Sequence, residues 1–502
     1  MKYIEGTPRD QLILFESYLD QVIEVDNPVR FFDEYVENLE LEKIGFALSP
    51  LKTGRPPYSP RVLLKIYMYC YFEKIRSSRK MEKECRRNQE LIWLTCNLTP
   101  DFKTIADFRK NNKRGLIGIF KEFLLFCKEK NLLSFDLAAV DGTKMRGQNS
   151  LNEVYSRKTI NQVQAGIDER ISQYFKELDE NDEKDSDELK LDKEKVNKIL
   201  TRICKLKKRK EKVDQIKDIF EQNPGIETYF ATDPDCRFQS DKGKVRPGYN
   251  PQIGTEGKNH LIIVNDVTNQ SNDSCQATPM KETIVKIKTE LGADQQTKIL
   301  FDAGYDSEKS ILENKDDTEN IALIQDRKEA ARKNIESGRK TSKKTRLPQR
   351  GFENTDFDYI VEEDEYECPA GKRLRKVGGM KKDKNNRDVF EYICGDCKDC
   401  LDHEKCTSSK RGRMLKVSAH ADEIKEYKAR VKNKENKKLL LRRKEMVEHP
   451  FGTFKRNWGF DYFMQRGIES VKAEFSFICF IYNLKRVLNI LDSETVHVLS
   501  ST

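Results

Sequence analysis

Helical periodicity dominates the first quarter of the chain. Apolar and aromatic residues fill positions 62–72, and polar turns at 77–79 and 97–100 separate this run from the shorter runs that follow. Ser59 before Pro60 is typical of a helix start, because a Ser side chain caps free N–H groups and Pro fits the first turn. Short helices with polar turns and many Arg residues indicate a helix-turn-helix layout. We expect residues 1–133 to form a helical domain, which either contacts DNA or only packs against the rest of the chain.

Strand patterns begin after residue 134. Short apolar runs at 135–140, 260–264, 297–301 and 320–324 predict strands, and residues 280–291 between them have helical spacing. Strands that alternate with helices indicate an α/β sheet. Helical patterns return at 421–492. We therefore expect one α/β core built from residues 134–325 and 421–492.

Two segments interrupt this core. Residues 151–225 are rich in Lys and Glu and place Val196, Ile199, Ile203 and Leu206 three to four positions apart. This spacing predicts a charged helical insert, which would serve for dimer contact or DNA clamping, or only as a solvated spacer. Residues 326–420 are basic, Cys-rich and poor in apolar runs, which indicates a second insert.

The charge of the chain is unevenly spread. The chain has 502 residues, of which 37% are hydrophobic and 35% charged, with a formal net charge of +9. Sixteen Lys or Arg face six Asp or Glu between residues 407 and 456. Such a run favours a polyanionic partner, although a solvated helix face has the same composition. The first ten residues lack the apolar core of a signal peptide, and the longest apolar stretch, 475–484, is too short to span a bilayer, so we expect a cytoplasmic protein without membrane contact.

Two predicted strands end in an Asp that a small residue follows, Asp141 before Gly142 and Asp302 before Ala303. The carboxyl ends of neighbouring strands meet at one edge of an α/β sheet, and carboxylates there suit a hard cation. Glu448, in the basic segment, would be the third acid. Two metal ions ~4 Å apart can activate a water or a 3′-hydroxyl and stabilise the leaving oxygen of a phosphodiester. The alternatives are turn or cap roles for the Asp residues and a surface role for Glu448.

Cations flank Glu448. If its helix is continuous, Lys444, Glu448 and Lys455 share one face, although Pro450 would kink or end such a helix. Cations beside a metal-binding carboxylate can hold the phosphate backbone of DNA. The residues expected to contact DNA are Lys444, Arg443, Lys455, Arg456 and, from the N-terminal helices, Arg79.

Five cysteines crowd between residues 368 and 406. Thiolates at such spacing suit a tetrahedral zinc ion, whereas reduced free thiols are the alternative. The favoured ligands are Cys368, Cys397, Cys400 and Cys406, with Cys394 as the substitute.

Several blocks, taken in order, resemble the DDE transposases of bacterial insertion sequences. The blocks are YSPR at 58–61 through DFR at 107–109, VDGTK at 140–144, DPD at 233–235 with GYNPQ at 248–252, FDAGYD at 301–306, and VEHPFGTFK at 447–455 with NLKR at 483–486. The likeness spans roughly residues 5–490. In related transposases the helix that carries the catalytic Glu has Tyr, Arg and Lys at fixed offsets. Here Lys455 matches that Lys, whereas Lys444 stands in the Arg position and Leu441 in the Tyr position.

The resemblance implies a ribonuclease H-like α/β fold with Asp141, Asp302 and Glu448 as the catalytic triad. It further implies dependence on Mg²⁺ or Mn²⁺, binding of terminal inverted repeats and target DNA, strand cleavage and strand transfer, and, since two ends must be paired, a homodimer. We expect such a protein to be nucleoid-associated in a bacterial cell. A domesticated nuclease on the same fold and a catalytically inactive DNA-binding regulator are the alternatives.

Overall fold

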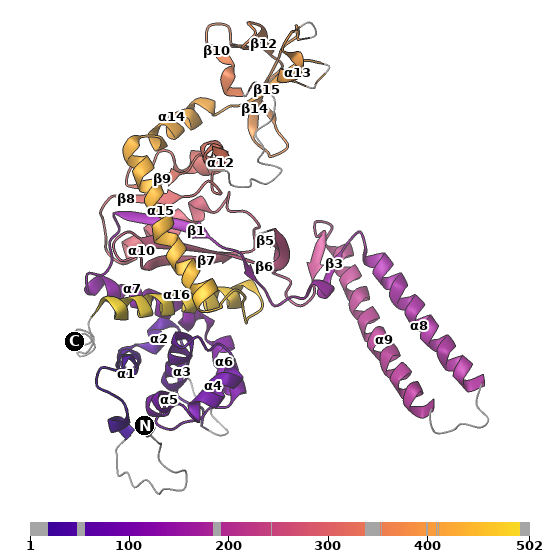
Figure 1. Ribbon diagram of the computed structural model, residues 1–502, viewed down its shortest axis with the longest axis vertical. Coiled ribbons are helices and arrows are strands. Elements are labelled where there is room, and N and C mark those ends of the chain that lie inside the picture. The colour runs from indigo at the N-terminus through magenta and orange to yellow at the C-terminus, as the bar shows by residue number, and fades with distance from the viewer. Residues whose placement is uncertain are drawn as a thin grey trace, which may run out of the picture.

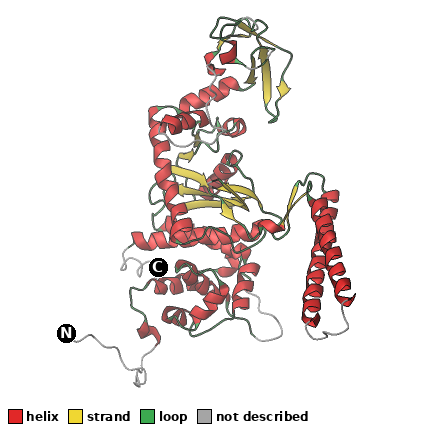
Figure 2. Cartoon of the chain, turned by 45° about the vertical axis from the view of Figure 1, so that its right-hand side comes forward, coloured by secondary structure: helices red, strands yellow, loops and turns green. Residues whose placement is uncertain are grey.

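The computed structural model describes residues 19–47, 56–183, 192–241, 243–336, 352, 354–397, 400–407, 409 and 411–491. A sheet flanked by helices lies at the centre, a block of N-terminal helices lies beside it, and two inserts project from it (Figure 1). The strands gather in the centre and in the Cys-rich insert, whereas the N-terminal block is helical (Figure 2). The mixed α/β fold expected from the sequence is confirmed. No helix of the described residues is long and apolar enough to cross a membrane.

Local capping explains where the N-terminal helices begin. The Ser59 hydroxyl accepts the Arg61 N–H at 3.3 Å and Pro60 occupies the first turn of its helix, as expected. Asp101 caps a later helix in the same way by accepting the Lys103 N–H at 2.9 Å. The elements are the 3₁₀ turn η1 (Leu19–Val22) and helices α1 (Pro28–Asn38), α2 (Leu41–Ile44), α3 (Pro60–Phe72), α4 (Ser78–Cys85), α5 (Gln89–Leu94), α6 (Phe102–Asn111) and α7 (Lys113–Glu129).

The central sheet mixes parallel and antiparallel pairs. Its order is β2-β6-β1-β8-β9, and β5 and β7 also pair with β6. β1 runs parallel to β8, with Ala139 opposite Leu300, and antiparallel to β6. Continuing the first register by two residues brings Asp141 opposite Asp302. The strands are β1 (Leu137–Gly142), β2 (Met145–Arg146), β5 (Arg237–Asp241), β6 (Lys244–Glu256), β7 (Ile262–Thr268), β8 (Thr297–Phe301) and β9 (Asn320–Ile324).

The C-terminal helix α16 (Ile468–Ile490) joins the sheet to the N-terminal block. The ring of Phe480 lies 5.3 Å from that of Phe123 on α7, and Phe477 lies 5.1 Å from Tyr71 on α3. On the other side, the Asn483 side chain exchanges two hydrogen bonds with the backbone of Ile262 on β7, at 2.7 and 2.8 Å. The N-terminal helices and the sheet therefore share one hydrophobic core through α16.

The acidic block at residues 233–235 holds the start of α16. The buried Asp233 carboxylate accepts the Gly467 N–H at 3.0 Å and the Tyr249 hydroxyl at 2.8 Å. Asp235 accepts the Ile468 N–H at 2.8 Å. These carboxylates satisfy N–H groups that a helix start leaves free, so their role is structural.

The remaining helices surround the sheet. α15 packs against β1, β6 and β8, and α10 packs against β6, β7 and β9. The bounds are α10 (Ala277–Glu290), α11 (Glu308–Asn314), α12 (Arg327–Glu336), α14 (Ala421–Val431), α15 (Lys434–Gly452) and the π-helical turn η5 (Thr453–Asn457).

The charged insert forms a helical hairpin. Helices α8 (Ile160–Glu183) and α9 (Asp192–Gln222) project from the body, and a two-stranded ribbon of β3 (Val154–Ser156) and β4 (Thr228–Phe230) lies at their base, beside the 3₁₀ turn η2 (Leu151–Glu153) (Figure 1). Ile167, Val213 and Phe220 are buried between the helices.

The Cys-rich insert contains a small antiparallel sheet, which the sequence did not predict. Four of its six strands have four residues or fewer, which is too short to show an alternating pattern. They are β10 (Asp358–Ile360), β11 (Glu365–Glu367), β12 (Arg373–Lys376), β13 (Lys381–Lys382), β14 (Asp388–Ile393) and β15 (Met414–Ser418), accompanied by the 3₁₀ turn η4 (Asn354–Asp356) and helix α13 (His403–Cys406).

Candidate active site

Two of the three candidate acids meet at the edge of the sheet. Asp141 lies near the end of β1, and Asp302 follows β8 directly. Burial raises the pKa of Asp141 to about 6, while the Arg443 guanidinium opposes the shift and the Asp302 carboxylate adds to it. A carboxyl group with such a pKa is desolvated and close to a second negative charge.

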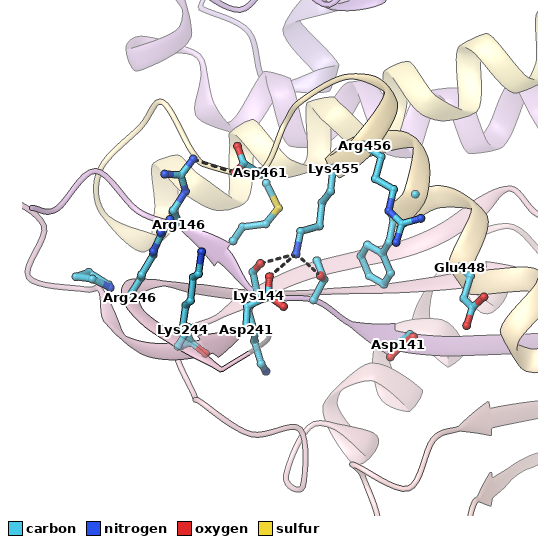
Figure 3. A pocket seen from close by; sticks show the side chains of 16 residues that line it. Asp141, Lys144, Arg146, Asp241, Lys244, Arg246, Glu448, Lys455, Arg456 and Asp461 are labelled. Atoms are coloured by element: carbon cyan, nitrogen blue, oxygen red, sulfur yellow. Dashed lines mark hydrogen bonds and ion pairs between the residues drawn. The ribbon is translucent and has the colours of Figure 1, made fainter. Parts of the chain in front are cut away.

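The third candidate acid approaches from a helix. Glu448 is exposed on α15 and lines, together with Asp141, a cavity of about 700 Å³. Figure 3 shows the Glu448 and Asp141 carboxylates at one end of this cavity. Asp302 is not among the residues that line it. The structure therefore brings Asp141 together with each of the other two acids, through the sheet in one case and across the cavity in the other.

The donors at this site suit a hard divalent cation, because carboxylate oxygens are its preferred ligands. Asp141 and Asp302 repel each other, and a cation between them would relieve that repulsion. Within the described part of the chain, however, no three His, Cys, Asp or Glu side chains form a group that could hold a metal ion. The carboxylates of Asp141 and Asp302 are nevertheless of the type that binds such a cation. Glu448 is a further acid that lines the same cavity as Asp141.

Arg443 has a position that the sequence did not suggest. Its side chain is buried, and its guanidinium forms an ion pair with the Asp141 carboxylate at 3.2 Å. Lys444, which stands in the family's Arg position, is exposed, as is Leu441 in the Tyr position. The residue that contacts Asp141 is therefore Arg443, which lies one place before the residue in the family's Arg position.

Lys455 is held by the protein itself. The helix α15 continues through Pro450 to Gly452 and then widens into the π-helical turn η5, so Pro450 does not end it. The Lys455 ammonium donates to Thr143 Oγ1 at 3.1 Å and to the Lys144 carbonyl at 2.9 Å (Figure 3).

A third bond from Lys455, to Asp241 Oδ2 at 3.2 Å, completes its set of partners. An ammonium group has three N–H donors, and each of these has an acceptor here. We conclude that Lys455 fastens the end of α15 to the connection between β1 and β2.

Basic side chains surround the cavity. Lys244 and Arg246 are exposed at the start of β6. They lie two positions apart, so they share one face of the strand, and this spacing can be read in the sequence. Arg456 is exposed at the rim, whereas Arg79 lies elsewhere, on α4 over the ring of Phe102. The basic residues that line the cavity are Lys144, Arg146, Lys244, Arg246, Lys455 and Arg456.

An acid that the sequence analysis missed lies beside the pair. Asp273, in the loop between β7 and α10, accepts hydrogen bonds from Asn250 at 2.7 Å, Gln252 at 2.8 Å and Lys144 at 3.3 Å. A lone Asp in a polar loop carries no pattern, so nothing in the spacing pointed to it.

The five clustered cysteines come together in the Cys-rich insert. All of them line one small pocket, together with His403. Burial, and then a hydrogen bond with Cys397, raises the pKa of Cys394 to about 12. The Cys368 and Cys397 sulfurs each accept a backbone N–H, at 3.3 and 3.4 Å. All five are free thiols in the structure, which leaves zinc binding as a prediction.

Comparison with known families decides the class of protein. A model described as a transposase DDE domain matches residues 367–488, and a model described as a transposase domain (DUF772) matches residues 17–111. Both matches support a DDE transposase of an insertion sequence. The resemblance inferred from the sequence is thus confirmed, and the DDE match supports a DNA-processing enzyme.

The DDE match begins within the Cys-rich insert, at residue 367, and covers α15 and most of α16, so it includes Glu448. Asp141 and Asp302 lie outside both matched segments of the transposase. No curated protein and no solved structure matched the chain.

Proposed function

We propose that the transposase cleaves DNA at the ends of its element and joins the freed 3′-hydroxyl to target DNA, with Asp141, Asp302 and Glu448 as the catalytic carboxylates. The observation that carries this proposal is the meeting of Asp141 and Asp302 at adjacent parallel strand ends, beside a basic cavity that Glu448 also lines. A ribonuclease H-like description of the core is supported by the mixed sheet, in which acids follow β1 and β8.

A divalent Mg²⁺ or Mn²⁺ ion held by these acids would supply the Lewis acid for attack at phosphorus. The chain's own residues prepare that site. Arg443 holds the Asp141 carboxylate from the buried side, and Lys455 fixes the β1–β2 connection from the other. Together they keep the acids in place before DNA arrives, which limits the cost of reorganisation during the reaction.

DNA would enter along the basic side of the cavity. Lys244, Arg246 and Arg456 are exposed there and would contact phosphate groups, which position a duplex without reading its sequence. Lys444 and Arg79 are exposed as well and remain candidates for outer contacts. Arg443 and Lys455 act through the protein in this scheme.

The wider organisation is also part of the proposal. It has four parts: a helical DNA-binding domain (1–133), a catalytic core whose first part (134–325) holds the insert 151–225, a Cys-rich insert (326–420) and the C-terminal helices (421–492). A zinc ion on the clustered cysteines would stabilise the third part. A homodimer would pair the two ends of the element, and a DNA-binding enzyme of this kind would be associated with the nucleoid.

The experiment is cleavage of a labelled duplex that carries the element's own end, with Mg²⁺ or Mn²⁺. The transposase is compared with Asp141→Asn, Asp302→Asn and Glu448→Gln, and binding of the same duplex is measured by fluorescence anisotropy. The matched control is Glu445→Gln, since Glu445 is an exposed acid on the same helix that does not line the cavity.

We expect metal-dependent cleavage to be lost in the three variants and retained in the control, while all four bind DNA. Cleavage that survives Asp141→Asn or Asp302→Asn would contradict the proposal. Cleavage that is lost in Glu445→Gln but survives Glu448→Gln would make Glu445 the third acid.

A further inference from the structure

We propose that Lys144 contacts the reacting phosphate and that Asp273 is the positioning residue that holds its ammonium group at the strand ends. This inference rests on the proposed phosphoryl transfer at Asp141 and Asp302. Neither residue belongs to the triad.

The backbone places Lys144 beside the acids. It lies three residues after Asp141, between β1 and β2, and its side chain lines the cavity with 16% of its surface exposed. The Thr143 N–H is bound to the Pro251 carbonyl at 2.9 Å, and the Lys455 ammonium is bound to the Lys144 carbonyl at 2.9 Å. The backbone that carries this side chain is therefore held by two other elements.

The partner of Lys144 is fixed even more firmly. One oxygen of Asp273 accepts from the side chains of Asn250, Gln252 and Lys144. Asn250 and Gln252 are fully buried on β6, and the Gln252 amide also donates to Asn250 at 3.0 Å and accepts from the Tyr305 hydroxyl. A carboxylate held by two buried amides cannot rotate away without leaving donors unpaired.

Two glycines make room for this arrangement. A Cβ atom on Gly142, next to Asp141, would lie 2.2 Å from Gln252 Nε2 and 2.9 Å from Asp273 Oδ1. A Cβ atom on Gly304, two residues after Asp302, would lie 2.9 Å from Asp302 Oδ1 and 3.6 Å from the other Asp273 oxygen. Asp273 thus reaches between the loops that follow both strands.

The charges explain what Lys144 is for. Asp273, Asp141 and Asp302 all act on its ammonium, and they oppose the effect of burial, which lowers the pKa of Lys144. Lys455, by contrast, has three protein acceptors. Among the described residues the Lys144 ammonium has one acceptor, Asp273 at 3.3 Å, so N–H donors remain for a phosphate oxygen.

A preorganised cation at this place would stabilise the negative charge that develops on the phosphate oxygens. The alternative is a structural ion pair, in which the Lys144 ammonium only neutralises the Asp273 carboxylate. The transposase offers a matched structural pair for comparison. Lys281 and Asp317 are 2.7 Å apart, with side-chain exposures of 9% and 33%, and neither lines the cavity.

The test compares Lys144→Met, Lys144→Arg, Asp273→Asn and the double variant Lys144→Met/Asp273→Asn with Lys281→Met. Single-turnover cleavage of the end duplex is measured at saturating DNA, with the DNA dissociation constant and the thermal unfolding midpoint determined alongside. Met keeps the aliphatic length of Lys, and Arg keeps the charge, so at least one variant retains the packing at this position.

We expect Lys144→Met to slow cleavage by about 10²-fold, the size of effect seen when one oxyanion donor is removed. Lys144→Arg should recover part of that rate, Asp273→Asn should slow cleavage less, and the double variant should be no slower than Lys144→Met. Lys281→Met should cleave at the parent rate. The non-additivity is the signature of a residue that acts through Lys144, because two independent structural losses would add.

A parent rate in Lys144→Met would overturn the inference, and so would additive losses in the double variant. These outcomes are distinct from failure of the proposed function. If Asp141→Asn still cleaves, the triad is wrong. If Asp141→Asn is inactive while Lys144→Met cleaves normally, only the role of Lys144 fails.

Discussion

A buried ion pair fastens the C-terminal helix to the N-terminal helices. Glu474 on α16 accepts the backbone N–H of Met464 at 2.9 and 3.0 Å and that of Gln465 at 2.9 Å. Its carboxylate lies 3.5 Å from the guanidinium of Arg76, and the two side chains are 0% and 6% exposed. Arg76 also donates to the Tyr462 carbonyl at 2.7 Å. Replacing Glu474 by Gln would keep the shape and remove the charge.

The loss in the free energy of unfolding depends on which contacts of Arg76 remain in the Glu474→Gln variant. Removing one partner of a buried ion pair costs about 3–5 kcal/mol, because the other charge stays buried without compensation. Arg76 keeps its bond to Tyr462 and lies over two aromatic rings, at 4.2 and 4.6 Å from their centroids. These remaining contacts reduce the expected cost. We therefore expect Glu474→Gln to lower the free energy of unfolding by roughly 2–4 kcal/mol.

The assay is urea unfolding, followed by circular dichroism and by the fluorescence of the two Trp residues. The series is Glu474→Gln, Arg76→Met and the double variant, with Glu469→Gln as the control, since Glu469 is an exposed acid in the first turn of α16. We expect the double variant to lose about 2 kcal/mol less than the sum of the single losses, and the control to change by about 0.5 kcal/mol or less. A loss below about 1 kcal/mol for Glu474→Gln, or additive losses, would refute the reasoning.

Two further predictions concern the sites. Gly142→Ala should abolish cleavage and lower stability by about 1–3 kcal/mol, because the new Cβ would displace the buried Gln252 amide, which lies 2.2 Å from its position. Gly166 is the control, because it is a helical position where a Cβ atom would have nothing within 4 Å. Gly166→Ala should leave cleavage unchanged and stability unchanged or slightly raised, so a loss of stability equal to that of Gly142→Ala would contradict the explanation. Transposase purified without chelator should contain one zinc per chain by elemental analysis, and Cys397→Ser should lower that content and the unfolding temperature of the insert. Metal-free protein with the parent's stability would exclude the site.

The sequence predicted those parts of the fold that rest on local patterns. Apolar runs ending in Asp141 and Asp302 marked two adjacent strands correctly, and Ser59 with Pro60 marked the start of a helix. The longest strand of the sheet, β6, was missed, because prolines and glycines interrupt its alternation. A Pro within a strand lacks the N–H group that pairs it, so its pattern resembles that of a loop.

The site was predicted as far as single residues allow. The acids could be named because each ends or occupies an element, whereas the partners of those acids depend on tertiary contacts. Arg443 and Asp273 meet Asp141 and Lys144 only because distant segments pack together, and no spacing in the chain records this. Lys455 could be placed near the site but not assigned its three protein acceptors.

Because α16 is near the C-terminal end of the sequence, the N-terminal helices are synthesised long before the helix that covers them. The aromatic face that Phe123 and Tyr71 present emerges early, but its cover, which includes Phe480, is translated some 350 residues later. At ~5–20 residues per second that interval lasts about 20–70 s. During it the N-terminal helices carry an uncovered apolar surface, which chaperones would recognise. A truncated product that lacks α16 would keep that surface exposed for its lifetime. We therefore expect such a chain to be removed by aggregation or proteolysis before it competes with the complete enzyme for DNA.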